Sequence, residues 1–316
     1  METNLLLSRF WTRIWALLID SIILGIFGFI LTALFKNFFI SLGSEGKLIG
    51  WFIALAYFSL LNSTLNKGQT IGKKMMNIQV VDCTGQFISL KTSFIRALIF
   101  TAPFFLNGYK IPGLTPFSVL TIIQSILIMT LGIGIIVFYI ANKETRQSVH
   151  DLVAGTYVVQ NYRNSMAKLM LPINKRSFYI TGGLIVIIIC TSVYNFTTNS
   201  TAKKLIPLYE NIMKQEEIAN ASITVNTLPL NNNTQVYTIV IQFKNNIANM
   251  KDPEYIIHNK EVKQAVKKFI DSQVYEKDTD ILNITLTSGY DIGISKSNYW
   301  IDTYKPLFKW RELYQF

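Results

Sequence analysis

The sharpest chemical feature of the sequence is a carboxylate inside a long apolar run. Asp20 is the one charged residue of Ile14–Phe35. A helix that enters hydrocarbon near Ile14 rises 1.5 Å per residue, which would place Asp20 about 9 Å deep. An ionised carboxylate there costs roughly 3 kcal/mol on insertion scales and normally faces the bundle interior or a water-filled cavity. Asp20 is therefore either a paired structural residue that fixes helix registry or a group that binds a cation or relays a proton.

Two arginines are candidate partners for Asp20. Arg13 precedes it by seven residues on the same helical face. Its side chain would point toward the helix N-terminus, so a direct contact with Asp20 would be strained. Arg96, at the inner end of another apolar segment, is an equally good partner. Both pairings stay open.

His150 and Asp151 precede a second, shorter apolar run. Asp at such a position commonly caps a helix or turn by accepting backbone N–H bonds, which is the interpretation we favour. The alternative is that Asp151, beside His150, closes the cytoplasmic end of a polar pathway that contains Asp20.

No common catalytic pattern is present. The segment Gly68–Lys73 (GQTIGK) has three residues between its glycines where a phosphate loop has four, and Lys74 stands where that motif needs Ser or Thr. Two cysteines and two histidines cannot build a Cys/His metal cluster or a disulfide framework. We expect no enzyme, no metal site and no cofactor.

Composition indicates an integral membrane protein. The chain is 50% hydrophobic and 16% charged, whereas soluble domains carry about a quarter charged residues. Residues 1–196 hold 16 Lys+Arg against 6 Asp+Glu, and residues 197–316 hold 14 against 13. The net charge of +11 thus lies in loops between apolar runs, which is typical of topology signals rather than nucleic-acid binding.

Four apolar segments approach the roughly 20 residues that cross hydrocarbon. They are Ile14–Phe35, Leu48–Leu61, Phe117–Ile140 and Phe178–Phe196.

A fifth crossing follows from the loop charges. The loop Asn62–Thr92 carries four lysines and Ala141–Ser177 carries six lysines and arginines, so both should be cytoplasmic. An even number of crossings must separate them, and Ala97–Leu106, despite Pro103, has to supply one beside Phe117–Ile140. The sequence predicts an α-helical protein with about five transmembrane helices, N-terminus inside and C-terminus outside, in a bacterial plasma membrane.

The last 120 residues predict a small soluble α+β domain on the far side of that membrane. Expected helices are Lys203–Ile218 and Glu254–Ile270, the latter amphipathic, and expected strands are Thr234–Phe243 and Ile281–Thr287, with a loop at Asn231–Asn233. On the cytoplasmic side, Asn77–Asp82 reads as a strand and His150–Val159 should dock against the bundle. The aromatic tail that begins at Trp300 is a candidate contact surface.

Four ordered blocks resemble the RDD family of membrane proteins: RFWTRIWALLID, GQTIGKKMMNIQVVD, SFIRALIF and RQSVHDLVAGTYVV. The family is named for one arginine and two aspartates. The resemblance places these at Arg13, Asp20 and Asp151, with Asp82 a weaker choice for the last, and it covers roughly residues 8–160. Further motif positions are Gly68, Thr70, Gly72, Lys73, Gly155 and Thr156.

The resulting division is an RDD-like transmembrane domain (1–165), an additional helix with linkers (166–199) and an extracytoplasmic domain (200–316). The resemblance implies transport, most concretely monovalent cation/proton exchange along a polar pathway through Asp20, Arg13, Asp151, Arg96 and His150. The alternative is a membrane-anchored scaffold or assembly factor whose last domain binds a protein partner. We expect the lipid bilayer as the main partner, and a homo-oligomer would supply further polar residues to an exchanger.

Overall fold

The structure is a computed structural model that describes residues 7–111, 114, 118–143, 145–160, 175–198, 200–228, 234–245 and 254–316. It forms two compact units. One comprises residues 1–31, 47–191 and 292–295, and the other comprises residues 32–46, 192–291 and 296–316.

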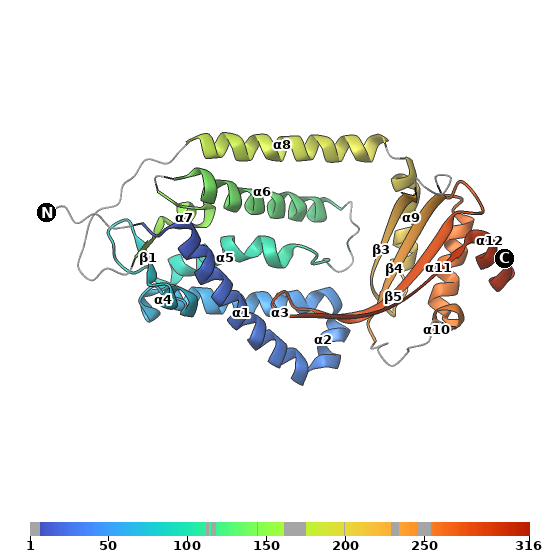
Figure 1. Ribbon diagram of the computed structural model, residues 1–316, viewed down its shortest axis with the longest axis horizontal. Coiled ribbons are helices and arrows are strands. Elements are labelled where there is room, and N and C mark those ends of the chain that lie inside the picture. Colours follow the sequence, from blue (N-terminus) through green and yellow to red (C-terminus); the bar gives the residue numbers. More distant parts are fainter. Residues whose placement is uncertain are drawn as a thin grey trace. The chain divides into compact units, whose positions relative to one another are not determined.

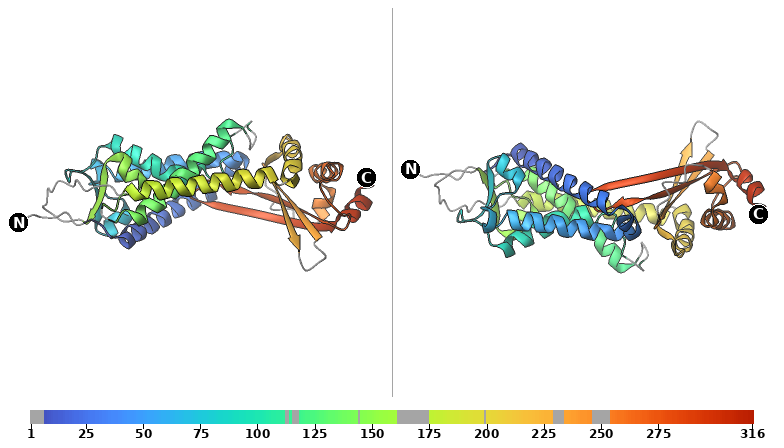
Figure 2. Two further views of the ribbon diagram at one scale, coloured as in Figure 1. Left: turned by 90° about the horizontal axis from the view of Figure 1, so that it is seen from above. Right: turned by 90° about the horizontal axis from the view of Figure 1, so that it is seen from below.

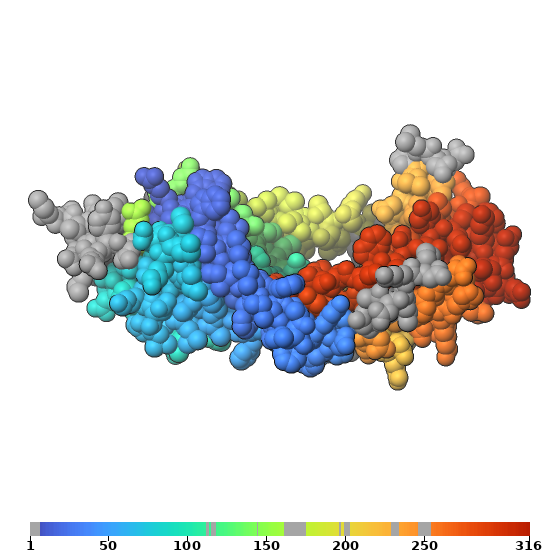
Figure 3. All heavy atoms as spheres, turned by 60° about the horizontal axis from the view of Figure 1, so that its bottom comes forward, coloured from blue at the N-terminus to red at the C-terminus, as the bar shows by residue number. Residues whose placement is uncertain are grey.

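Long apolar helices dominate the first unit (Figure 1). They are α1 (Phe10–Leu34), α3 (Gly46–Leu61), α5 (Leu90–Leu106), α6 (Val119–Ala141) and α8 (Lys175–Thr198). Side chains such as Trp11, Ile22 and Phe52 are exposed, as expected for surfaces that face lipid. In Figure 3, α1 forms a continuous blue band across one face of this unit.

Among the described residues, four segments are long and apolar enough to cross a membrane: Phe10–Leu34, Lys36–Leu61, Val119–Ala141 and Lys175–Asn195. The second combines α2 (Lys36–Leu42), the 3-10 helix η1 (Gly43–Glu45) and α3. Each contains most of one of the four predicted long spans. The chain is therefore a multi-pass membrane protein.

The short apolar segment Ala97–Leu106 is the C-terminal part of the 17-residue helix α5. The Ser89 hydroxyl caps this helix by accepting a hydrogen bond from the Thr92 N–H at 3.2 Å, and Pro103 lies inside it. Arg96 is buried within α5, which packs beside α6 and the short helix α7 (Val149–Ala154). The two views of Figure 2 also place α5 within the bundle.

A two-stranded sheet joins distant parts of the first unit. Strand β1 (Ile78–Asp82) pairs antiparallel with β2 (Thr156–Gln160), with Val80 opposite Val158. The prediction of a strand at Asn77–Asp82 is confirmed, and the His150–Val159 stretch forms α7 and most of β2. The helices η2 (Thr64–Asn66) and α4 (Ile71–Met75) precede β1.

The second unit has a four-stranded sheet in the order β3-β4-β5-β6, in which β4 and β5 are parallel and the outer pairs antiparallel. The strands are β3 (Ile218–Leu228), β4 (Thr234–Phe243), β5 (Ile281–Asp291) and β6 (Lys296–Pro306). The helices α9 (Ser200–Met213), α10 (Glu254–His258), α11 (Lys260–Asp271) and α12 (Leu307–Tyr314) accompany it. As the alternation in β4 predicts, Tyr237, Ile239, Ile241 and Phe243 are all buried in the core.

Several predicted boundaries in this unit are wrong. The first helix ends at Met213, and Ile218 already begins β3. The predicted helix Glu254–Ile270 is two helices, because the Asn259 side chain accepts a hydrogen bond from the Val262 N–H at 3.1 Å and starts α11 anew. Strand β6 was not predicted. The predicted loop Asn231–Asn233 lies outside the described residues.

Candidate functional site

Asp151 is neutralised by two arginines. Its Oδ1 accepts bonds from Arg96 Nε at 2.9 Å and Nη2 at 2.8 Å, and its Oδ2 lies 3.6 Å from Arg13 Nη1. All three side chains are buried. Burial alone would raise the pKa of Asp151, but Arg96, and after it His150 and Arg13, hold this pKa well below its usual range. The carboxylate therefore remains ionised and fixed in place.

Arg13 extends this ion-paired cluster to the sheet. Its Nη2 donates to the Val158 carbonyl oxygen at 3.1 Å, and its Nη1 donates to the Arg146 carbonyl oxygen. Its guanidinium also stands over the Tyr139 ring, 5.8 Å from the centroid. The ion-paired cluster of Arg13, Arg96 and Asp151 thus ties α1, α5, α6 and α7 to β2.

The predicted partners of Asp20 are therefore wrong, since both arginines bond Asp151. Asp20, 1% exposed, instead accepts three hydrogen bonds: from Tyr57 Oη at 2.6 Å, Thr70 Oγ1 at 2.6 Å and Gly72 N at 2.8 Å. Within the part of the chain that the structure describes, no salt bridge reaches Asp20. Its charge is held by neutral donors rather than by a cation.

The glycine motif positions these donors. Thr70 is the N-cap of α4 and accepts from the Lys73 N–H at 3.2 Å while its hydroxyl donates to Asp20. A Cβ on Gly72 would lie 2.1 Å from the Ala16 carbonyl oxygen, so only glycine lets α4 approach α1 this closely. Gly72 is therefore required for the packing that places α4 against Asp20 and is not part of a phosphate loop.

Gly68 and Gly155 have positive φ angles, a backbone conformation that favours glycine. Gly68 has a φ of +69°, and a Cβ there would lie 2.3 Å from the Val80 carbonyl oxygen. Gly155 ends α7 with a φ of +64°, which leads directly into β2. The next residue, Thr156, donates its hydroxyl to Asp151 Oδ1 at 3.1 Å. The motif residues thus divide into one group around Asp20 and another around Asp151.

Lys73 is a buried base near Asp20. Its Nζ donates to Asn62 Oδ1 at 2.7 Å. Burial, followed by the positive charge of Arg96, lowers the pKa of Lys73 to about 7, although Asp20 and Asp151 oppose this shift. Lys73 therefore changes charge near neutral pH, a property that its place in the family motif did not reveal.

His150 is a neutral, buried imidazole. Burial lowers its pKa to about 3, against the opposing effect of Asp151. Its Nε2 lies 3.6 Å from Asp151 Oδ2, and its ring meets Phe100 edge-on with centroids 5.0 Å apart. The favoured prediction that Asp151 caps a helix is wrong, because Ser148 is the N-cap of α7 and Asp151, in the first turn, holds two arginines instead.

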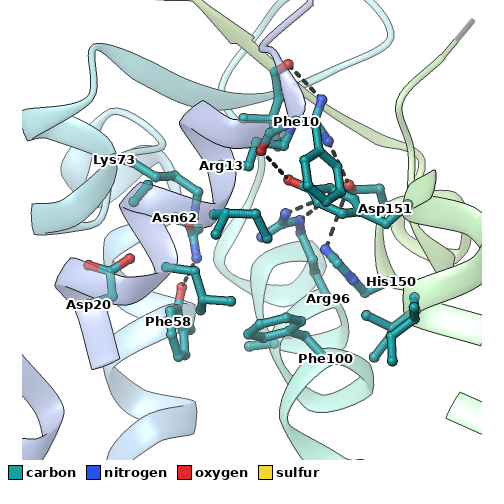
Figure 4. A pocket seen from close by; sticks show the side chains of 18 of the residues that line it. Phe10, Arg13, Asp20, Phe58, Asn62, Lys73, Arg96, Phe100, His150 and Asp151 are labelled. Carbon is teal, nitrogen blue, oxygen red and sulfur yellow. Dashed lines mark hydrogen bonds and ion pairs between the residues drawn. The ribbon is translucent and has the colours of Figure 1, made fainter. Parts of the chain in front are cut away.

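These groups surround one cavity of about 380 Å³ (Figure 4). Its polar lining residues are Arg13, Asp20, Asn62, Lys73, Arg96, His150 and Asp151. Figure 4 shows Arg13, Arg96 and His150 converging on Asp151, while Asp20 lies apart from them. The rest of the lining is largely apolar, from α1, α3, α5 and α6. Among the described residues, no group of three or more His, Cys, Asp or Glu side chains gathers to hold a metal ion.

Fold and site define a helical, multi-pass membrane protein whose bundle is locked by a buried arginine–aspartate cluster. Residues 7–155 match the RDD family model. It is similar to the uncharacterized protein YckC of Bacillus subtilis (strain 168), with 29% identity over 155 residues that cover 48% of this chain and 83% of YckC. No solved structure matches the chain. The helix α8 and the α+β unit follow the family segment.

Proposed function

We propose that this protein is a membrane transporter, most concretely a monovalent cation/proton exchanger, in which Asp20 is the carboxylate that carries the exchange. One contrast supports the proposal. Asp151 is held by two guanidinium groups, whereas Asp20 lines the cavity and accepts hydrogen bonds from neutral donors. Asp20 can therefore bind and release a cation without breaking the ion-paired cluster that holds the helices together.

The atoms around Asp20 suit a hard cation. Such ions prefer oxygen ligands. The hydroxyl oxygens of Tyr57 and Thr70 already lie 2.6 Å from the carboxylate. Asn62, whose side-chain oxygen accepts from Lys73, lines the same cavity as Asp20. A bound cation would require the two hydroxyls to turn their protons away and offer lone pairs.

Lys73 supplies the proton side of the exchange. Its pKa of about 7 means that it is charged below neutral pH and neutral above it. Charged Lys73 would repel an entering cation. If Lys73 loses its proton as the cation binds, the total charge of the cavity is the same before and after the exchange. The charged groups that act on Lys73 are Arg96, Asp20, Asp151 and Arg13. Competition between one cation and one proton follows from this arrangement.

The topology that we propose has five crossings with the N-terminus and both basic loops in the cytoplasm. Pairing of β1 with β2 supports it, because these strands belong to the two loops and must lie on one side of the membrane. The Ser8 N–H also donates to the Val158 carbonyl oxygen at 3.0 Å, which brings the start of α1 to that side. Both α5 and α6 must then cross, and α8 leads to an extracytoplasmic α+β unit. A bacterial plasma membrane fits the bacterial relative.

A scaffold or assembly factor is the second candidate. Trp300 and Tyr304 are exposed on β6, which is an edge strand of the sheet. Exposed aromatic residues on an unpaired edge suit recognition of a protein partner. In that case deletion of residues 200–316 would remove the phenotype, and Asp20→Asn would chiefly lower stability.

The deciding experiment is dissipation of a pH gradient by added Na⁺, K⁺ or Li⁺ in everted vesicles from a host without its own antiporters. We expect a cation-dependent signal that Asp20→Asn abolishes at normal protein levels. Asp82→Asn is the matched control, because Asp82 makes the same kind of side-chain bonds in a turn with Thr84, outside the cavity. If well-inserted wild-type protein gives no signal, the proposal of cation/proton exchange is refuted and the scaffold function is favoured.

A further inference from the structure

We propose that the 380 Å³ cavity is a binding site for a single-chain amphiphile with an anionic head, such as a fatty acid. This inference goes beyond cation exchange and does not require it. It rests on the two chemical halves of the cavity and on buried polar atoms there that lack a partner.

The apolar half suits an acyl chain. Its walls include Phe58 of α3, Phe100 and Phe104 of α5, and Ile135, Ile136 and Ile140 of α6. Aromatic and aliphatic walls with a few convergent polar groups are typical of small-molecule sites. Because the walls come from apolar helices of the bundle, a chain from the bilayer is the closest source of apolar material.

The polar half has unmet hydrogen-bonding capacity. Arg13 Nε and His150 Nδ1 are buried atoms without a hydrogen-bond partner, although their residues are only 8% and 7% exposed. Buried polar atoms in native proteins nearly always find a partner. Both residues line the same cavity, so a single ligand can satisfy both atoms. Arg13 Nε can only donate, and the ligand must therefore present an acceptor.

The charges favour an anionic acceptor. The polar lining holds Arg13, Arg96 and Lys73 against Asp20 and Asp151, which leaves one positive charge in excess while Lys73 is protonated. The Lys73 ammonium group has three N–H donors, and one of them donates to Asn62. The others can donate to a ligand. A carboxylate or phosphate head would neutralise the excess and accept from Arg13 Nε. A neutral His150 carries its proton on Nε2, which faces Asp151 Oδ2 at 3.6 Å, so Nδ1 is an acceptor. It would accept from the O–H of a phosphate monoester head or from a water held beside a carboxylate.

The volume of the cavity favours a ligand with a single acyl chain. A volume of about 380 Å³ lies near the lower end of the range for small-molecule sites, roughly 300 to 1,000 Å³. A phospholipid with two chains and a glycerol headgroup is too large to enter whole. The head would lie beside α4 and α7, with the chain along α3, α5 and α6.

The test is equilibrium binding of radiolabelled myristate to purified, delipidated full-length protein, with myristyl alcohol and phosphatidylglycerol as competitors. We expect saturable binding with one site per chain, in which the alcohol competes at least about tenfold more weakly because it lacks the charge-assisted hydrogen bonds. Ile135→Trp, at a partly buried position of the lining, should fill the apolar half and weaken binding by a similar factor. Ile122→Trp, an exposed position of the same helix outside the cavity lining, should bind as wild type does.

Three outcomes would overturn the inference. They are equal competition by the alcohol and the acid, unchanged binding by Ile135→Trp, and stoichiometric displacement by phosphatidylglycerol, which would assign the site to a two-chain lipid. His150→Phe gives a second test that keeps the aromatic contact with Phe100 and should still weaken myristate binding. Asp20→Asn removes a negative charge from the cavity lining, so this variant should bind myristate at least as tightly as wild type even though it abolishes cation exchange. Failure of cation exchange and failure of this inference are therefore separate results.

Discussion

Replacing Gly72 by alanine should separate α4 from α1. The added Cβ would lie 2.1 Å from the Ala16 carbonyl oxygen and 2.9 Å from Asp20 Oδ1. Ordinary contacts need more than 3.4 Å, so α4 would have to retreat by about 1 Å or more from a helix backbone that cannot yield. That retreat would stretch the bonds to Asp20 from Gly72 N, at 2.8 Å, and from Thr70 Oγ1, at 2.6 Å. Overpacking costs about 1–3 kcal/mol, and weakened hydrogen bonds to a buried charge add about 1.5–3 kcal/mol.

Thermal unfolding of the purified protein in detergent measures this cost. We expect Gly72→Ala to lower the free energy of unfolding by about 2–5 kcal/mol. Gly182→Ala is the matched control, because Gly182 lies within α8 with no neighbouring atom within 4 Å of an added Cβ. Its stability should stay level or rise slightly, since alanine favours helices. Equal unfolding temperatures for Gly72→Ala and wild type would refute the packing role given to the motif.

Three further predictions follow from the buried charges and the second core. Arg96→Met should lower the free energy of unfolding by about 3–5 kcal/mol, because it leaves the buried Asp151 carboxylate without its main ion-pair partner. The double variant with Asp151→Asn should lose less than the sum of the two single variants, which a double-mutant cycle of unfolding free energies would measure. The pKa of Lys73 falls from 10.5 to about 7, so the unfolded chain binds more protons between these values. Stability should therefore rise with pH from about 7 toward 10, and Lys73→Met should flatten this rise in a melting series. Trp310→Ala should lower the free energy of unfolding by about 3–5 kcal/mol, because the fully buried ring of Trp310 donates to the Leu282 carbonyl oxygen at 3.0 Å. The β-sheet signal in circular dichroism should then be lost at a lower temperature. An unchanged melting curve would contradict the place of Trp310 in the core.

Hydropathy and alternation predicted the elements whose environment is uniform along their length. The four long apolar segments are such elements, because hydrocarbon demands a run of apolar residues whatever the neighbours are. Strand β4 is another, since its buried side chains at Tyr237, Ile239, Ile241 and Phe243 alternate with less buried ones at Thr238, Val240 and Gln242. Strand β6 escaped prediction because it is an edge strand, and Trp300 and Tyr304 are exposed where a strand pattern would bury them. The break at Asn259 escaped because a single capping residue interrupts an otherwise continuous helical face.

The site was predicted by residue type but not by pairing. Asp20, Arg13, Arg96 and Asp151 were all chosen from the sequence, and the structure brings them to one cavity. Their partners could not be derived, because each bond joins segments far apart in the chain. Tyr57, which donates to Asp20, gave no signal beyond being a polar tip inside an apolar run.

The arrangement of the two aspartates bears on how any transport would work. A carboxylate that must release its counter-ion cannot also be the strut that holds the helices, since removing one partner of a buried ion pair costs several kcal/mol. Here the two tasks lie on different residues. Asp151 joins α7 to α1 and α5 through Arg13 and Arg96, while Asp20 is held by a backbone N–H and two hydroxyls that can reorient. A cation could therefore bind at Asp20 while the ion-paired cluster stays closed, and the proposed exchange requires this division.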